Sequence, residues 1–273
     1  MKRLDWNKTK TMFIVVFAIL NVFLYSLYLN QYNEAQNVRV LGETSIEESL
    51  NHDNISYGPL PEYPEEMSYV SADTAPFSKS ELSKYKNQEF VISEETILYA
   101  TLEEPYMIKN ARGDYQFTDF LTNYVPYGEE YLLWEVVEEN QFALFFQKVE
   151  EYPIYFNYNA MLIVYWDEKG NITHYEQQRF GEFDSFNKKK DILSPRDVIN
   201  TLYSRDYLKK DSSVTSISLG YSTLITLTQT QVFAPTWRVR VELKDGEFED
   251  HFVNAIEGKM VEFQQERNEN VVE

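Results

Sequence analysis

Three histidines are the side chains of this sequence best suited to metal binding or acid–base catalysis, because the chain contains no cysteine. Without cysteine there are no disulfides, thiolate nucleophiles or iron–sulfur ligands. His52, His174 and His251 have no mutual spacing typical of a metal site or a catalytic triad. His174 and His251 lie among residues with strand patterning, where a hydrogen-bonded surface histidine is the commoner outcome. We therefore predict that none of the three is a ligand.

Neighbouring glutamates are the other groups that could do acid–base chemistry. Glu103 and Glu104 are adjacent in sequence, as are Glu129 and Glu130. Adjacent side chains of a strand point to opposite faces, so neither pair could act together on one substrate. The sequence also lacks a phosphate-binding loop, a nucleophile elbow and a His-Glu-x-x-His motif. We predict a non-enzymatic protein with no catalytic residue, cofactor or metal, and an anchored hydrolase with dispersed carboxylates remains an alternative.

The acidic composition limits the partners of this protein. Its 273 residues include 25 basic and 44 acidic side chains, a formal net charge of −19. Four basic residues and one acidic residue lie within the first 30 positions, so the rest of the chain carries −22. A field of that sign repels nucleic acid and anionic lipid headgroups. We therefore expect no nucleic-acid partner.

An apolar run at residues 12–29 predicts one membrane-spanning helix. The run has 18 uncharged residues. At about 1.5 Å per residue it reaches about 27 Å, which with its flanks spans a hydrocarbon core of about 30 Å. Because a positively charged flank stays in the cytoplasm, residues 1–11 are expected to form a cytoplasmic head. The C-terminal domain is then extracellular, and the protein is a single-pass protein of the cell membrane.

A cleaved signal peptide is the alternative interpretation of this run. Such a peptide has an apolar region of about 7 to 15 residues followed by a small-x-small cleavage site. The run here is longer, and the segment from Tyr28 to Ala35 contains no Ala-x-Ala site. We therefore predict an uncleaved anchor.

A single amide in the middle of the apolar run, Asn21, predicts a contact with another membrane helix. A carboxamide in hydrocarbon is unfavourable without a partner, and interhelical polar contacts contribute about 0.6 to 2 kcal/mol. Residues three, four or seven positions away share its face of the helix. The predicted contact face consists of Phe17, Ala18, Asn21, Leu24, Tyr25 and Tyr28. The alternative is that Asn21 hydrogen-bonds to water, to a lipid headgroup or to its own helix.

Beyond the anchor, the patterning predicts an α+β fold of antiparallel sheets, each packed with a helix. Residues 30–87 include four prolines and are expected to form a stalk or a wrapping segment. Residues 88–185 and residues 186–273 are each expected to form an α+β module. The two modules are similar in the predicted order of their elements, which is one helix followed by four strands.

Local patterns place the main elements of these modules. Alternating apolar residues separated by short polar turns predict hairpins within residues 131–149 and 159–180. Apolar residues at helical spacing predict a helix at residues 115–124. Ser194, followed by proline and then by aspartate at the third helical position, predicts the start of a second helix. A final strand pair is predicted within residues 252–263.

Several short stretches of the sequence are similar to those of a known family. They are residues 5–11, which run directly into the anchor, Gln147 with residues 152–154, residues 174–177, residues 235–239 and residues 253–258. In this order the chain resembles the YycI family (WalI), regulatory proteins of the WalK/WalR (YycG/YycF) two-component system of low-GC Gram-positive bacteria. The plan of a short head, one membrane helix and an exported domain also matches.

The resemblance implies a regulator rather than an enzyme. Such proteins act with a companion, YycH, and with the sensor histidine kinase WalK in the membrane, and thereby modulate the signalling that controls cell-wall metabolism. The family is associated with control through membrane helices, which agrees with the face predicted around Asn21. The exported fold is expected to resemble the later domains of the companion protein.

An exported, membrane-tethered binding module for peptide or cell-wall fragments is the alternative function. The tyrosine-rich edges of its sheets would then bind the ligand, and the anchor would only hold the module at the membrane. Replacing the anchor by an unrelated helix separates these functions. A regulator that acts through its helix loses function, whereas a tethered binder or hydrolase keeps it.

Overall fold

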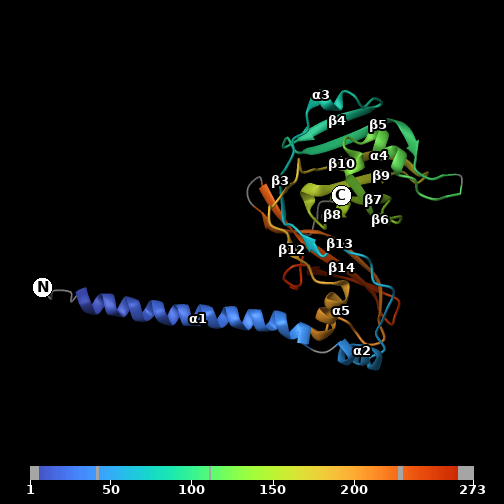
Figure 1. The fold of residues 1–273 in the computed structure, drawn as a ribbon. Helices are drawn as coiled ribbons and strands as arrows, with labels where there is room; N and C mark the ends of the chain where they lie inside the picture. The colour runs from blue at the N-terminus through green and yellow to red at the C-terminus, as the bar shows by residue number, and fades with distance from the viewer. Residues whose placement is uncertain (1–5, 41–42, 111, 227–229, 264–273) are drawn as a thin grey trace.

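The computed structural model describes residues 6–40, 43–110, 112–226 and 230–263 (Figure 1). Helix α1 (Trp6–Val40) extends away from a sheet-rich folded domain. Its segment Lys10–Leu29 has a mean hydropathy of 2.3, and none of it is buried against the rest of the chain. An apolar helix of this length can cross a bilayer, so the chain fits a single-pass membrane protein.

The first sheet is antiparallel, with the strand order β4-β5-β10-β9-β7-β6. Its strands are β4 (Gln88–Ser93), β5 (Ile97–Met107), β6 (Tyr131–Val137), β7 (Phe142–Val149), β9 (Met161–Trp166) and β10 (Asn171–Gln177), and β8 (Tyr152–Pro153) pairs with β7. The predicted hairpins are confirmed as the pairs β6–β7 and β9–β10. Alternation of apolar and polar residues therefore located these strands correctly.

One face of the first sheet is covered by helix α4 (Thr118–Tyr124). Phe120 of this helix is fully buried and packs on the core that Leu98, Phe145 and Val164 line from the strands. The helix predicted at residues 115–124 is thus present but begins three residues later. The preceding residues instead pair across a turn, since Tyr115 forms a β-bridge to Lys109.

The second sheet has the order β1-β13-β14-β3-β11, and β15 also pairs with β14. Its strands are β1 (Ser56–Tyr57), β3 (Val70–Asp73), β11 (Asp184–Ser185), β13 (Ser213–Thr226), β14 (Thr230–Glu242) and β15 (Phe248–Asn254). Strand β3 pairs with the start of β14, and β15 pairs with its end. Helix α5 (Pro195–Ser204) packs on this sheet through Val198, Ile199 and Leu202, which are buried. The predicted α+β class, with a sheet-rich domain after an apolar helix, is confirmed.

Several short elements complete the described part of the chain. Helix α2 (Glu43–His52) and strands β1 and β3 come from the segment for which a stalk or a wrapping segment is expected, and they add to the second sheet and its core. Strands β2 (Glu66–Met67) and β12 (Lys190–Asp191) pair with each other. Short helices are α3 (Lys79–Leu82), η1 (Gly128–Glu130) and η2 (Tyr158–Ala160). The predicted domain boundaries stay predictions.

The last predicted strand pair is present only in part, as a short antiparallel β-bridge. Strand β15 pairs with β14, and residues 259–263 contribute only a β-bridge between Val253 and Met260. The Asn254 side chain accepts hydrogen bonds from the backbone N–H groups of Ile256 and Glu257, both at 2.9 Å, which fixes a tight turn. Three strands rather than four therefore follow α5 among the described residues, and the predicted common element order does not hold.

A third, aromatic cluster joins the two sheets. Phe146 of the first sheet and Phe252 of the second pack with Tyr155, which lies between them. Gly220 on β13 permits this packing, because a Cβ at that position would lie 2.5 Å from the Tyr155 ring. Arg238 of β14 also stacks on Trp134 of β6, with the guanidinium carbon 3.9 Å from the ring centroid. The sheets are therefore in direct side-chain contact.

The start of α5 is fixed by a reciprocal hydrogen-bond pair. Ser194 Oγ accepts from the backbone N–H of Asp197 at 3.1 Å, and the Asp197 carboxylate accepts from the backbone N–H of Ser194 at 3.2 Å. Pro195 occupies the first helical position. The helix start predicted at Ser194 is confirmed, and the two reciprocal hydrogen bonds form a capping box that satisfies backbone donors left unpaired by the helix.

Replacing Ser194 by alanine is expected to lower the free energy of unfolding by about 1 kcal/mol, because the cap is lost. Urea unfolding of the full chain in detergent, followed by tryptophan fluorescence, measures this change. Ser204→Ala, an exposed serine at the other end of the same helix, is the matched control and should have little effect. Equal unfolding midpoints for the two variants would contradict the assignment.

Candidate functional site

The three histidines lie on different elements, and His174 and His251 are partly desolvated. His174 stacks on Tyr165 with the ring centroids 4.5 Å apart, and burial lowers its pKa. Burial also lowers the pKa of His251, against the opposing effect of Glu249. Among the residues that the structure describes, no group of three or more histidine, aspartate and glutamate side chains could hold a metal ion.

The predicted contact face follows one side of α1. At about 100° per residue, its six positions all lie within about 60° of Asn21 around the helix axis. Phe17 is 67 % exposed, Leu24 is 54 % exposed and Tyr25 is 63 % exposed. These side chains thus form an apolar strip that the folded domain leaves uncovered. Ala18 and Tyr28 extend the strip along the same side of the helix.

Asn21 makes a hydrogen bond within its own helix. Its Nδ2 donates to the carbonyl oxygen of Phe17 at 2.8 Å. This is one of the alternatives to a partner contact, and it lowers the cost of placing the amide in hydrocarbon. A carboxamide has a second N–H donor and an oxygen acceptor, so one bond does not exhaust its capacity. The amide can still bond to a neighbouring helix while its own helix orients it.

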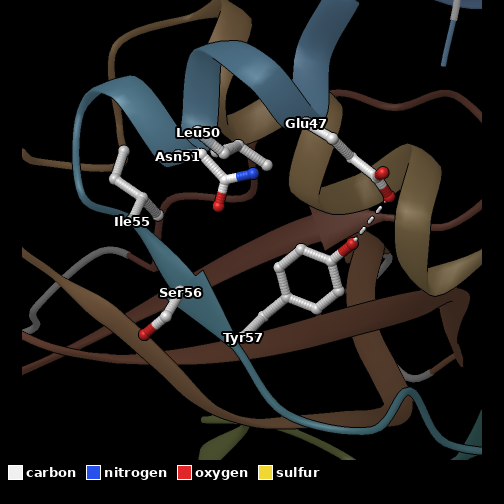
Figure 2. A pocket seen from close by; sticks show the side chains of 6 residues that line it. All are labelled: Glu47, Leu50, Asn51, Ile55, Ser56 and Tyr57. Carbon is white, nitrogen blue, oxygen red and sulfur yellow. Dashed lines mark hydrogen bonds between the residues drawn. The ribbon is translucent and has the colours of Figure 1, made fainter. Parts of the chain in front are cut away.

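Helix α2 connects the membrane helix to the second sheet. Ile46 and Leu50 are one turn apart on α2, and both are buried in the core of the second sheet. Glu47, on the same helix, forms an ion pair with Arg196 at the start of α5. The Tyr57 hydroxyl on β1 donates to Glu47 at 3.1 Å, above a shallow pocket of about 290 Å³ (Figure 2). The N-terminal half of α2 is therefore held by both α5 and β1.

The other end of α2 is also tied to the region of α5. Asp53, directly after α2, accepts a hydrogen bond from the Tyr203 hydroxyl at 3.0 Å and pairs with Lys210 Nζ at 2.8 Å. The hydrogen bond from Lys210, followed by that from Tyr203, lowers the pKa of the Asp53 carboxyl. Helices α1 and α5 also lie close together where α1 reaches the domain. Helix α2 is therefore packed against the second sheet and α5, and α1 lies next to α5.

Sequence reasoning predicted a contact face on α1, which stays a prediction, but missed the packing of α2 on the second sheet. The signal available was the spacing of Ile46 and Leu50, four positions apart, which is typical of one face of a helix. The polar residues around this pair obscured the signal. The partners of Glu47 and Asp53 lie about 150 positions away, at Arg196 and Tyr203, so no local pattern could indicate them.

The family model described as YycI protein matches residues 33–256, which is most of the chain. The chain belongs to the YycI family. This confirms the resemblance seen in the sequence and associates the chain with the WalK/WalR regulatory system. The matched range begins after the segment Lys10–Leu29, so it covers the folded domain and not the membrane span. YycI is a regulatory family rather than a known family of enzymes.

This YycI chain was also compared with curated proteins and with solved structures. No curated protein matches the sequence. Among solved structures, it is similar to an uncharacterized protein from Eubacterium rectale, with 15 % sequence identity and a TM-score of 0.47. The alignment covers 78 % of this chain and 92 % of that one.

Proposed function

We propose that this YycI chain is a non-enzymatic regulator that contacts a WalK-type sensor histidine kinase through its membrane helix. A YycH-type companion protein is its second partner, and the complex modulates signalling for cell-wall metabolism. The observation that supports this most directly is the apolar span of α1, none of which is buried against the folded domain, in a chain of a regulatory family. A helix face that its own protein leaves open is available for another membrane helix.

The proposed orientation places residues 1–11 in the cytoplasm and the folded domain outside the cell. The basic flank of the apolar run supports it, because positive flanks are retained on the cytoplasmic side. The net charge of −22 after residue 30 also supports it, since an acidic domain does not bind to anionic lipid headgroups.

Regulation of this kind requires no catalytic group. It requires that the helix bind one state of the kinase helices more tightly than another, because only a difference in affinity shifts an equilibrium. A difference of about 1.4 kcal/mol would change the ratio of the two kinase states about tenfold. A few apolar contacts together with one polar contact from Asn21 are sufficient for a difference of this size.

Replacing Asn21 by leucine is expected to weaken association with the kinase about threefold to thirtyfold, because interhelical polar contacts contribute about 0.6 to 2 kcal/mol. Co-purification of the kinase with the full chain from detergent-solubilised membranes measures this loss. Ser26→Leu is the matched control, since it also removes a polar group but lies about 140° away around the helix. Full recovery of the kinase with Asn21→Leu would rule out the proposed contact face.

A further inference from the structure

The first sheet has a second face, opposite to α4, that carries exposed apolar side chains. Val91 on the edge strand β4 is 63 % exposed, and Tyr99 on β5 is 39 % exposed. Their sequence neighbours point to the other face, where Leu98 and Ala100 are buried beneath α4. We call the face that carries Val91 and Tyr99 the open face.

Strand register aligns the open-face residues in two rows across the sheet. In the first row Val91 pairs with Tyr99, Tyr99 with Glu176, Glu176 with Ile163, and Ile163 with Leu144. The row ends at Leu144, which packs against the aromatic cluster between the two sheets. Neighbours in such a row lie about 4.5 to 5.5 Å apart at their Cβ atoms and form a continuous surface. The row therefore places one carboxylate in the middle of apolar and aromatic side chains.

The second row is largely aromatic. Thr101 pairs with His174, His174 with Tyr165, and Tyr165 with Phe142. The Tyr165 ring lies flat on the His174 ring, with an interplanar angle of 8°. Burial raises the pKa of Tyr165 to about 12, so its hydroxyl stays neutral and the ring remains an uncharged surface. The two rows together give an aromatic floor beside Glu176.

The charge of the open face points to a cationic partner group. Glu176 is partly buried, and this burial raises the pKa of its carboxyl. Among the described residues no lysine or arginine pairs with it, whereas other partly buried carboxylates, such as Asp250, have such a partner. A desolvated carboxylate without a countercharge is unfavourable, and a cation supplied by a partner would remove that cost.

A second copy of the chain is a poor match for this face. Two open faces that meet symmetrically would bring the two Glu176 carboxylates together, and like charges in such an arrangement repel. The net charge of −19 adds a general repulsion between copies. The occupant must therefore differ from this chain in charge.

We propose that the open face binds a second protein that presents a lysine or arginine surrounded by apolar side chains. The cation pairs with Glu176 and lies against the neighbouring Tyr99 ring, and the apolar side chains cover Val91, Ile163 and Tyr165. Ion pairing combined with stacking on an aromatic ring is favourable in a partly desolvated site. This surface lies on the folded domain, so it is a contact separate from the proposed membrane-helix contact and does not depend on it.

Photocross-linking from a single cysteine tests this proposal. Because the chain has no cysteine of its own, Thr101→Cys gives one labelling site on the open face for a benzophenone maleimide. The labelled full chain is incorporated into membranes from cells that naturally produce this protein, and the membranes are irradiated. Mass spectrometry then identifies the peptide that is cross-linked to position 101. We expect a protein partner with a lysine or arginine next to the cross-linked position.

Charge reversal then decides whether that partner uses the proposed site. Glu176→Lys should lower the cross-link yield at least tenfold, and changing the partner's basic residue to glutamate should restore it. Glu168→Lys is the matched control, because it makes the same charge change on the exposed turn of the same β9–β10 hairpin. Circular dichroism confirms that each variant is folded. A yield unaffected by Glu176→Lys, or a cross-link only to lipid, glycan or a second copy, would overturn the proposal.

Discussion

Cells in which residues 12–29 are replaced by an unrelated apolar helix of equal length are expected to lose control of the kinase completely. The replacement keeps the anchor and the folded domain but removes every side chain of the contact face. Regulation of this kind depends on a difference in affinity for two states of the kinase helices. A helix without the proposed face binds both states equally, so it cannot shift the equilibrium between them. The measurement is the level of phosphorylated response regulator in cells with the native helix, the replaced helix or no protein.

The replacement also separates the alternative functions. A tethered binding module or an anchored hydrolase needs only to be held at the membrane, so cells with the replaced helix would behave like cells with the native one. The control is the amount of the helix-replaced protein at the membrane, measured through its folded domain, which must equal the amount of the native protein. Unchanged phosphorylation at equal amounts would move the functional contact from the helix to the folded domain.

Replacing Arg238 by methionine is expected to lower the free energy of unfolding by about 3 kcal/mol. The guanidinium forms two parallel hydrogen bonds to Asp250, at 3.0 Å and 2.9 Å, and stacks on Trp134 of the other sheet. The Arg238 side chain is only 15 % exposed. Removing one partner of a buried ion pair costs about 3 to 5 kcal/mol because the other charge stays unpaired, and the 23 % exposure of Asp250 favours the lower value. Urea unfolding of the full chain in detergent measures the change.

Lys244→Met provides the comparison for this prediction. It removes the same charge near the end of β14, from a pair with Asp211 in which the lysine is 77 % exposed. Exposed pairs of this kind contribute little, because solvent screens both charges. If the two variants unfold at the same urea concentration, neither the ion pair of Arg238 with Asp250 nor its stacking on Trp134 contributes the expected stability.

The parts of the fold that sequence predicted are those fixed by local chemistry. The β6–β7 and β9–β10 hairpins are visible because alternation and a polar turn are both short-range signals. The start of α5 is visible because Ser194, Pro195 and Asp197 are each typical of one helical position. In these segments the tertiary structure and the local preferences agree.

The parts that sequence did not predict depend on distant pairing. Strand β1 has two residues and pairs in parallel with β13, and strand β3 has four and pairs with β14. Segments this short carry no recognisable alternation, and the prolines around them indicate loops. Their structure comes from the edges that the long strands β13 and β14 offer. The second sheet could therefore not be assembled from local patterns alone.

The candidate site also has features that the sequence indicates and features that only the structure shows. Asn21 stands out because it is one amide within an apolar run, and its neighbours follow from helical geometry. The hydrogen bond to Phe17 depends on the side-chain rotamer, which the sequence does not specify. The fixation of α2 through Glu47 and Asp53 depends on Arg196 of α5 and on Lys210 after it, about 150 positions along the chain, so only the structure reveals it.

Position-specific cross-linking along α1 tests the contact of this helix with the kinase most directly. Single cysteines at positions 17, 21 and 24 lie on the proposed face, and those at positions 19, 23 and 26 lie on the opposite side. Each is cross-linked to kinase helices in native membranes, and no background arises because the chain has no other cysteine. The proposal predicts kinase cross-links from the first set and few from the second. Equal yields from both sets, or none from either, would contradict it.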